Sequence, residues 1–533
     1  MSIQSTLYYN ATIVTGDRSR PRAEAMLVAD GAIAAVGRRD EVADLAPVSA
    51  AGVDLDGATV VPGFNDCHMH ILSMGLGLSQ LDLTPNSAPS ILDICRLVAA
   101  RAAKLPDGHW ILGRGYNQNL LSDRRHPTSE DLDGVSGDHP VVIWHTSGHV
   151  VVANTAALRA AEIGLGTPDP VGGEIQRDSR GVPTGILKEN AMKLVRAAIP
   201  LPTLEQARDA ILQASEVLAA EGITSASDAA TGQIHEMRNE ARIYRMALET
   251  GRLKTRVVLM PVIEQVTADA VAPSDLEVGE LSEWLSVGAA KVFTDGALTT
   301  RTAAMRQPYA SGEGDGILTW DGSELVQRCR QATALGWQLA AHAIGDRAVE
   351  QVLDTFASIG LAADARPRIE HATICDSGQI ARMKDLGVSV VLQPEDIAVL
   401  GDAYPPALGS DRARDNSPVA WFREVDLPIA FSSDRPVTPG DPLVGVRAAV
   451  ERMTPSGAAQ GPAHRISAET AIGYYTQGSA WATRSETWRG ALRPGLRADF
   501  VVLDRDITAC ESEEITQASV LRTVIDGESV HEA

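Results

Sequence analysis

Residues 60–70 read Val60-Val61-Pro62-Gly63-Phe64-Asn65-Asp66-Cys67-His68-Met69-His70, an apolar run that ends in two histidines. Successive side chains of a β-strand point to opposite faces, so we expect His68 and His70 on one face and Cys67 on the other. If this strand belongs to a closed barrel, both imidazoles face the C-terminal mouth, where such enzymes hold their chemistry. Two converging imidazoles supply half of a divalent metal site. We predict that role for the pair and a packing role for Cys67.

Downstream of this stretch, short apolar segments alternate with helical patterns such as Leu204 to Ala220 and Asp346 to Ser358. Short apolar strands separated by helices are typical of a parallel sheet that is covered on both faces. Counting from Val60 predicts eight strands, near residues 60, 223, 255, 287, 338, 368, 388 and 428. Eight is the number that a (β/α)8 TIM barrel requires, and a doubly wound sheet is the alternative.

The two ends of the chain are rich in predicted strands. Asp30-Gly31 separates two apolar runs and predicts a hairpin, and Asp526-Gly527 marks a similar turn near the C-terminus. We therefore predict one small β-sandwich domain from residues 1–60 and 486–533, and a barrel domain from residues 61–485. Residues 80–200 form a large insertion after the first barrel strand, which we interpret as a lid or substrate-binding subdomain.

Composition limits the class of partner. The 533-residue chain has a net charge of −22, which disfavours nucleic acid and anionic membranes because both reward clustered Lys and Arg. Its five cysteines are scattered, without a CxxC pair, which fits a reducing compartment. No apolar stretch approaches the length of a membrane span. We expect a cytoplasmic protein that acts on a small molecule, and a homodimer is an open possibility.

Residues able to bind metal fall at the ends of several predicted strands. Taken singly, each has a structural explanation: a strand histidine is often a hydrogen-bonded core residue, a lysine reaches solvent, and an aspartate after two serines caps a turn. Jointly, four histidines, a lysine and an aspartate at strand ends indicate a metal site. The set is His68, His70, Lys291, His342, His371 and Asp434.

This order of residues resembles the amidohydrolase superfamily, and more closely its YtcJ-like branch (amidohydrolase family 3), which includes N-substituted formamide deformylases. The resemblance covers nearly the whole chain. It is carried by residues 62–70, by Lys291-Val292-Phe293-Thr294-Asp295-Gly296, by His342-Ala343-Ile344-Gly345-Asp346, by Arg368-Ile369-Glu370-His371, by Ser432-Ser433-Asp434 and by Pro494-Gly495-Leu496-Arg497-Ala498-Asp499. Within the insertion it includes Gly148-His149-Val150 and Gly185-Ile186-Leu187-Lys188-Glu189.

The resemblance implies a metal-dependent hydrolase. His68, His70 and Asp434 would hold one divalent ion, and His342 and His371 a second. Lys291, carbamylated by CO2, would bridge them, whereas an unmodified ammonium would repel a cation and leave a single metal. Asp434 would take a proton from the attacking water and pass it to the leaving nitrogen. Zinc suits imidazole and carboxylate ligands first, with manganese, iron or cobalt as alternatives.

Other polar residues receive supporting roles. His149 or His145, from the insertion, would stabilise the oxyanion, and Glu370 and Asp295 are partners that orient the ligands or plain structural groups. Trp110 and Tyr116, with Trp144 and Trp320, would line an apolar substrate pocket, although large aromatic residues more often belong to a core.

The leading hypothesis is hydrolysis of a linear C–N amide, with an N-substituted formamide or N-acyl compound as substrate. The same site could instead cleave a cyclic amide, a lactone or another ester. A hypothesis from a different class is a non-catalytic metal-binding scaffold on the same fold, which the loss of a ligand would favour, and this chain has lost none.

Overall fold

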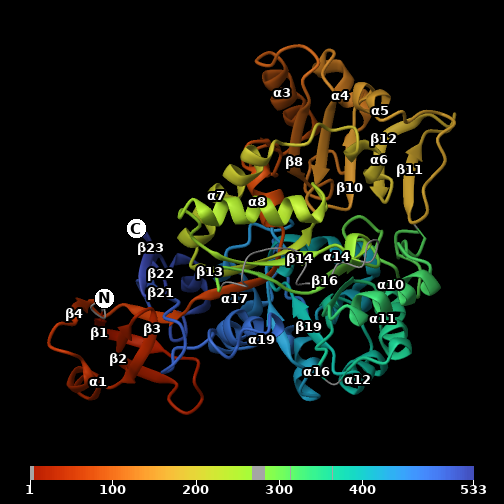
Figure 1. Cartoon of the computed structure of the whole chain (residues 1–533). Helices are drawn as coiled ribbons and strands as arrows, with labels where there is room; N and C mark the ends of the chain where they lie inside the picture. Colours follow the sequence, from red (N-terminus) through yellow and green to blue (C-terminus); the bar gives the residue numbers. More distant parts are fainter. Residues whose placement is uncertain (1–4, 267–282, 313, 363) are drawn as a thin grey trace.

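The computed structural model describes residues 5–266, 283–312, 314–362 and 364–533 (Figure 1). After the opening stretch, parallel strands form one sheet of four strands and one of five. Apart from the insertion between β6 and β13, neighbours in each sheet follow one another in the chain, so the order does not reverse as it does in a doubly wound sheet. These strands are β6 (Phe64–Met69), β13 (Ile223–Thr231), β14 (Arg256–Pro261), β15 (Leu285–Val287), β16 (Ala290–Phe293), β17 (Leu339–Ala343), β18 (Arg368–His371), β19 (Ser389–Leu392) and β20 (Ile429–Phe431).

Two local contacts connect the two parallel sheets. The expected strand Ser286 to Phe293 is interrupted at Gly288 and Ala289, which separates β15 from β16. A parallel bridge from Val262, directly after β14, to Lys291 in β16 links the two sheets. At the other edge, the backbone N–H of Asp434 donates to the carbonyl of His68 at 2.8 Å, so the segment after β20 lies against the end of β6.

Helices between the strands cover the sheets on their outer side, as Figure 1 shows for α10, α11 and α12. Their apolar faces join the parallel strands in one large core, which includes Ile211, Val352 and Phe422. The covering helices are α7 (Leu204–Ala220), α8 (Met237–Glu249), α10 (Gly322–Ala334), α11 (Asp346–Ile359), α12 (Ser377–Asp385), α16 (Val419–Glu424) and α17 (Pro442–Glu451).

The opening stretch is two strands rather than one, which corrects the strand expected from Val60. β5 (Thr59–Pro62) pairs with terminal strands, and β6 begins after Gly63 in the parallel sheet. Proline lacks an N–H for a continued ladder, and a Cβ on Gly63 would lie 2.2 Å from Thr224 Oγ1, so only glycine allows this close crossing. His68 and His70 consequently belong to β6 and its exit.

Both chain ends contribute to one sheet of eight strands, in the order β23-β22-β21-β5-β1-β2-β3 with β4 beside β1. β5 and β21 join the two ends as antiparallel neighbours, with Val61 opposite Val501. The predicted hairpin at Asp30-Gly31 connects β2 and β3. The strands are β1 (Ser5–Val14), β2 (Arg22–Ala29), β3 (Ala32–Gly37), β4 (Ala51–Asp54), β5, β21 (Phe500–Leu503), β22 (Val520–Ile525) and β23 (Glu528–Glu532), with helix α1 (Arg39–Leu45) alongside.

The insertion folds around its own six-stranded sheet, ordered β11-β12-β10-β9-β8-β7, which stands apart at the top of Figure 1. Along β10, Val150 and Val152 pack into one apolar cluster while Val151 and Ala153 pack into another, so both faces are covered. The strands are β7 (Leu81–Asp82), β8 (Ile111–Tyr116), β9 (Val141–His145), β10 (Val150–Ala153), β11 (Gly173–Arg177) and β12 (Pro183–Glu189); the helices are α3 (Ile91–Ala102), α4 (Ser129–Ser136), α5 (Thr155–Ala160) and α6 (Met192–Arg196).

Shorter helices complete the chain: α2 (Ile71–Gly77), α9 (Ile263–Val266), α13 (Glu395–Leu400), α14 (Tyr404–Leu408), α15 (Ser410–Arg414), α18 (Ala468–Gly473), the π-helix Tyr474–Gly478 and α19 (Ser479–Ala482). In the part of the chain that the structure describes, 3-10 helices cover Gly401–Ala403, Pro462–His464 and Ser512–Gln517. Among the described helices, none combines the length and the apolar character that crossing a membrane would require.

Candidate metal centre

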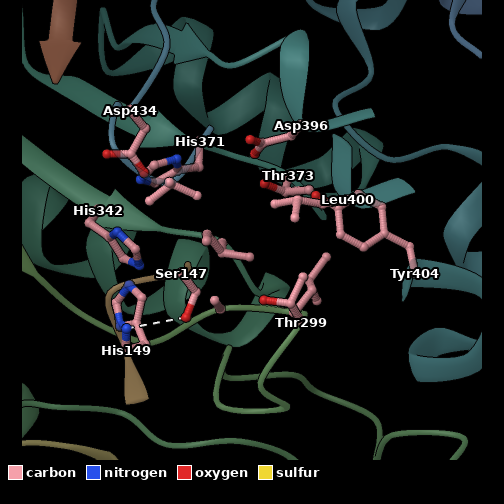
Figure 2. Close-up of a pocket in the computed structure, with 14 residues that line it drawn as sticks. Ser147, His149, Thr299, His342, His371, Thr373, Asp396, Leu400, Tyr404 and Asp434 are labelled. Carbon is pink, nitrogen blue, oxygen red and sulfur yellow. Dashed lines mark hydrogen bonds between the residues drawn. The ribbon is translucent and has the colours of Figure 1, made fainter. Parts of the chain in front are cut away.

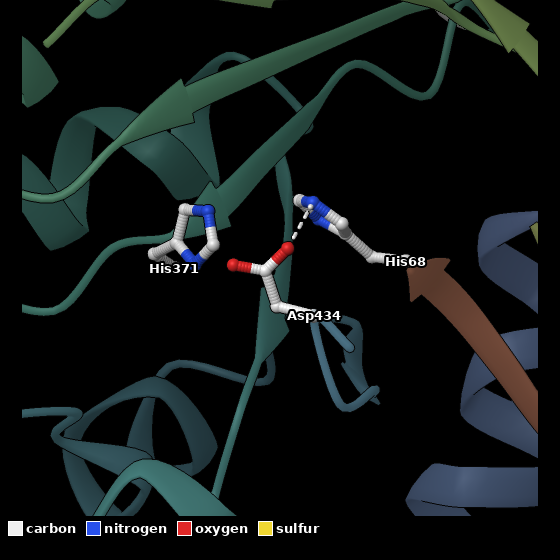
Figure 3. Close-up of side chains that lie close together, drawn as sticks. All are labelled: His68, His371 and Asp434. Atoms are coloured by element: carbon white, nitrogen blue, oxygen red, sulfur yellow. Dashed lines mark ion pairs between the residues drawn. The ribbon is translucent and has the colours of Figure 1, made fainter. Parts of the chain in front are cut away.

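The carboxyl ends of the parallel strands bring the predicted ligands together. His68 Nε2 lies 3.0 Å from Lys291 Nζ and 3.2 Å from Asp434 Oδ1, and His70 Nε2 lies 3.1 Å from the same carboxylate oxygen. One ligand atom each from His68, His371 and Asp434 lies within 4.8 Å of the others (Figure 3). We call His68, His70, Lys291, His371 and Asp434 the strand-end centre.

His342 stands beside this centre rather than within the tightest group. Its ring centroid lies 4.5 Å from that of His371, while its Nε2 lies 3.2 Å from the Gly296 carbonyl oxygen and 3.3 Å from Asp295 Oδ1. Asp295 is itself held by the backbone N–H groups of Ala304, Ile344 and Gly345. In this geometry, Asp295 lies close enough to orient His342.

Carboxylate and amide groups orient the two buried histidines. His68 Nδ1 lies 2.6 Å from Glu370 Oε2, and Arg368 Nε donates to the other oxygen of Glu370 at 2.7 Å. His371 Nδ1 lies 2.7 Å from Gln393 Oε1, and His371 Nε2 is buried without a hydrogen-bond partner among the described residues. Metal-binding histidines commonly donate one ring nitrogen to such a partner and turn the other toward the metal.

The pKa shifts of these residues also favour the protonation states that bind a metal ion. Burial raises the pKa of Glu370, but Arg368 and His68 outweigh it and hold the pKa far below the ordinary value. Burial similarly opposes ionisation of Asp434, yet His68 and His70 hold its pKa well below the usual range. Burial keeps the pKa of His371 well below its ordinary value, so this imidazole is neutral at pH 7 and has a free electron pair to offer.

Lys291 is fully buried within the centre. Burial lowers its pKa to about 8, although Glu370 and Asp434 act in the opposite direction. A lysine with a lowered pKa has an accessible neutral amine, which is the form that reacts with electrophiles such as CO2.

The loop after β20 is held by an aspartate that the sequence analysis did not single out. Asp66 Oδ1 accepts from the backbone N–H of Ser433 at 3.1 Å and from that of His68 at 3.3 Å, and its second oxygen accepts from the Ser433 hydroxyl. Asp434 adopts a left-handed backbone with φ of 56°, an uncommon conformation for a non-glycine residue. Asp66 therefore connects β6 to the turn that presents Asp434.

The insertion contributes one predicted residue to the site. His149 Nδ1 lies 2.8 Å from Glu189 Oε2, and the His149 ring centroid is 5.1 Å from that of His342. Burial lowers the pKa of His149, but Glu189 outweighs burial and the net direction is upward. The insertion therefore closes over the side of the centre where His342 lies.

Other predicted insertion residues lie elsewhere. Tyr116 is fully buried, with its hydroxyl 3.1 Å from His126 Nδ1, and His145 Nδ1 lies 2.9 Å from the Ser147 hydroxyl. Trp110 packs against the second apolar cluster of the insertion. The structure places none of these three side chains in the lining of the pocket, because they serve the insertion's own core. Cys67, as expected, is buried among Val391, Ala430 and Ala482.

A pocket opens directly onto the centre (Figure 2). His342, His371 and Asp434 form one side of it, and His149 and Ser147 reach it from the insertion. The rest of the wall is mostly apolar, with three further polar side chains: Ala297, Leu298, Ile344, Leu400, Tyr404 and Val437, together with Thr299, Thr373 and Asp396.

Comparison with known proteins agrees with this geometry. Residues 51–531 match the amidohydrolase family. The chain belongs to this family. It is 31% identical to the protein YtcJ of Bacillus subtilis, over 99% of each chain, and 30% identical to the N-substituted formamide deformylase of Arthrobacter pascens, over 98% of each. The resemblance stated from the sequence motifs is confirmed.

Solved structures support the same conclusion for this amidohydrolase. A metal-dependent hydrolase from Pyrococcus horikoshii superposes with a TM-score of 0.76 at 27% identity, covering 96% of this chain and 99% of the other. The chain thus has the TIM-barrel-type fold of metal-dependent hydrolases, and its buried His and Asp ligands form a candidate metal site.

Several site residues of the amidohydrolase were missed in the sequence. Arg368 precedes Glu370 by two positions on a strand, and this spacing predicts that both face the same side. Gln393 directly follows β19, so it meets the same strand-end criterion as the ligands. Asp396 lies four residues beyond that strand, in the first turn of α13, where no simple pattern identifies it.

Proposed function

We propose that this amidohydrolase cleaves a linear C–N amide bond, with an N-substituted formamide or another N-acyl amine as substrate. The observation that carries the proposal is the group of His68, His371 and Asp434 atoms within 4.8 Å of one another beside a pocket. The full-length similarity to an N-substituted formamide deformylase supports the choice of bond.

The residues of the centre fit divalent metal. His371 Nε2 is buried without a partner in the described part of the chain, and the imidazole and carboxylate donors suit zinc. His68, His70 and Asp434 would hold one ion, and His342 and His371 a second. A bound divalent ion lowers the pKa of water and polarises a carbonyl group.

Lys291 decides between one and two ions in this proposal. As an ammonium 3.0 Å from His68 Nε2, it competes with a cation for that atom. After its ammonium has lost a proton, attack of the neutral amine on CO2 would form an N–C bond, open one C=O double bond and release a second proton, so that a carboxylate replaces the positive charge. We propose that this carbamate would be an additional carboxylate ligand, which would allow the site to hold two divalent ions.

The chain's own groups account for the proton transfers and for positioning. Asp434, which faces both the centre and the pocket, accepts the proton of the attacking water and delivers it to the nitrogen that leaves. His149, with its pKa raised by Glu189, donates a hydrogen bond to the oxygen on which charge develops. Glu370 and Gln393 keep His68 and His371 oriented toward the centre.

The proposed function implies a closed barrel and a separate terminal domain. We propose that the two parallel sheets form one closed eight-stranded barrel over residues 61–485, and that residues 1–60 and 486–533 form a β-sandwich domain. The insertion 80–200 would act as a lid, which His149 at the pocket wall supports. The net charge of −22 supports a small molecule as the partner, and the scattered cysteines support a cytoplasmic location.

Metal analysis and a substrate panel test the proposal. Protein purified without chelator or added metal should contain about two divalent ions per chain, and chelation should abolish amide hydrolysis until zinc is restored. About one ion would indicate an unmodified Lys291. Absence of metal, with none bound on adding zinc, would contradict the mechanism and favour a non-catalytic scaffold.

The panel separates the proposed bond from its alternatives. It should contain N-alkylformamides, N-acetyl amines, a cyclic amide, a lactone and a simple ester, each assayed with the metal-loaded protein. Faster turnover of the linear amides supports the proposal, and faster turnover of the lactone or cyclic amide would replace it.

A further inference from the structure

Asp396 is a pocket residue that the proposed mechanism does not use. It lies in the first turn of α13, after β19, and lines the same pocket as His371 and Asp434. Figure 2 shows its carboxylate above Thr373, with the oxygens pointing toward the side of the pocket that holds His371 and Asp434. The group therefore faces the space that a substrate would occupy.

The carboxylate of Asp396 has no partner within the described ranges. Its Oδ1 is enclosed and accepts no hydrogen bond, and no described cation forms an ion pair with it. Arg368 satisfies the buried carboxylate of Glu370, and three backbone N–H groups satisfy that of Asp295. Glu189 and Glu395 each have one bonded oxygen and one without a partner among the described residues. A buried carboxylate oxygen without a donor is costly, and such groups in folded proteins commonly meet a ligand or a partner.

The surroundings favour a cation as that ligand. Burial raises the pKa of Asp396 well above its ordinary value, and Asp434 and Glu395 raise it further, so this group ionises in the pocket only when a positive charge lies beside it. An ammonium group supplies hydrogen-bond donors and a compensating charge together, whereas a neutral donor supplies only the first. The adjacent wall of Leu400 and Tyr404 is apolar enough to hold the methylene chain of an alkylamine.

We propose that Asp396 is a specificity-determining residue that binds a second, protonated amino group of the substrate, so that the substrate is a mono-N-formyl or mono-N-acyl diamine. The proposal rests on the proposed amide hydrolysis. Water adds across the C–N bond, and the products are a carboxylate and a free diamine. One amine was the leaving nitrogen near Asp434, and the other stays at Asp396.

Matched substrates test this inference. Mono-N-formyl diamines with two to five methylene groups are compared with N-formyl alkylamines of equal length that end in a methyl group. For the best chain length, kcat/KM of the cationic member should exceed that of the neutral member at least about tenfold, as a charge-assisted hydrogen bond implies. In Asp396→Asn this ratio should fall to about one, because the amide cannot balance an ammonium charge.

Two controls keep the comparison specific. Asp411→Asn removes the same charge from an exposed residue of α15, outside the pocket lining, and should retain the wild-type ratio. Melting temperature and metal content of Asp396→Asn should match the wild type, which shows that the change acts on binding. A wild-type ratio near or below one, or a ratio that Asp396→Asn leaves unchanged, would overturn the inference.

A binding measurement separates this inference from the proposed function. Calorimetric titration of the metal-loaded protein with 1,4-diaminobutane should show binding that Asp396→Asn weakens about tenfold or more, whereas 1-butanol, which carries no cation, should bind weakly to both. If no amide is cleaved but the diamine binds in this way, the proposed function fails and the role of Asp396 stands. If amides are cleaved without any cation preference, the proposed function stands and the role of Asp396 fails.

Discussion

Two buried arginine–carboxylate pairs, each with an arginine that is the first residue of a parallel strand, have different roles. Near the strand-end centre, Arg368 donates to the two oxygens of Glu370 at 2.7 and 3.0 Å, and Glu370 in turn lies 2.6 Å from His68 Nδ1. At the start of β14, Arg256 holds Asp499 through contacts of 2.8 and 3.0 Å. Both arginines are only 1% exposed.

The Arg256–Asp499 pair has a structural role, whereas the Arg368–Glu370 pair contacts a predicted metal ligand. Arg256 also donates to Asp526 and lies over the rings of Trp284 and Trp488, so it ties the terminal sheet to the parallel strands. The same chemical unit thus contacts His68, a predicted metal ligand, in one place and joins the terminal sheet to the parallel strands in the other.

The largest effect that separates the two places is expected from Asp434→Asn. Loss of the proton-accepting carboxylate should lower kcat by about 10^2–10^4-fold, with a melting temperature close to that of the wild type. Steady-state kinetics and thermal unfolding of the same preparation provide the check, with Asp411→Asn as the control. A kcat within a few-fold of the wild type would remove Asp434 from the mechanism.

Asp499→Asn should produce the opposite result. Arg256 would keep its buried charge with only Asp526 beside it, so the free energy of unfolding should fall by about 3 kcal/mol while kcat of the folded protein stays unchanged. Denaturant unfolding and active-site titration measure the two quantities. Asp526→Asn, at the more exposed partner, should cost less, and a large loss of kcat in Asp499→Asn would mean that the two places are coupled.

Glu395 is a buried carboxyl group that accepts from Thr438 and Gly440 rather than from an arginine, and it can be compared with Glu370. Burial raises the pKa of Glu395 to about 8, whereas the pKa of Glu370, beside Arg368, lies far below the ordinary value. Folded protein therefore binds a proton at Glu395 that the unfolded chain has released, so this residue makes stability decrease as pH rises between the ordinary carboxyl pKa and about 8.

Glu395→Gln cannot ionise and should remove that part of the pH dependence. The stability of the variant relative to the wild type should increase by roughly 2 kcal/mol between about pH 5.5 and pH 7. Unfolding at several pH values measures the difference. Parallel pH profiles for the two proteins would show that Glu395 is ionised in the fold.

The smallest expected effect concerns the link between Arg368 and His68. Glu370→Gln weakens the hydrogen bond that fixes His68, so the metal affinity of the folded protein should fall about tenfold, and the loss of the carboxylate beside buried Arg368 should also lower stability, as in Asp499→Asn. Competition with a chelator of known affinity measures this change. Glu350→Gln, which disrupts a half-exposed ion pair with Arg382, should leave metal affinity unchanged, and equal affinities for all three proteins would exclude an orienting role for Glu370.

The sequence predicts much of the fold because its local signals are strong. The helix expected from Leu204 to Ala220 has those bounds in the structure, since Thr203 and Gln206 form a capping box at its start. The hairpin at Asp30-Gly31 is equally local. The insertion sheet was not predicted, because its strands pair across intervening helices and in mixed directions, and no short-range pattern specifies that order.

The residues of the candidate site also fall into those that the sequence predicts and those that it does not. His68, Lys291, His371 and Asp434 follow from the rule that parallel strands end at one edge. The contact from Arg368 to the carbonyl of Cys67 joins residues 301 positions apart, so it emerges only from the assembled sheets. Asp66, which holds the loop of Asp434, could be suspected from its spacing two residues before His68, but its partner Ser433 could not.

The passage of the chain from β5 to β6 at Gly63 affects the order in which parts of the protein can fold. β5 receives one of its two neighbouring strands, β21, from residues 500–503, near the end of the chain. While the chain is still emerging from the ribosome, the segment that leads into His68 is therefore anchored on one side only. The support on its other side arrives only when residues 500–503 have been synthesised, so folding that proceeds from the N-terminus must wait for β21.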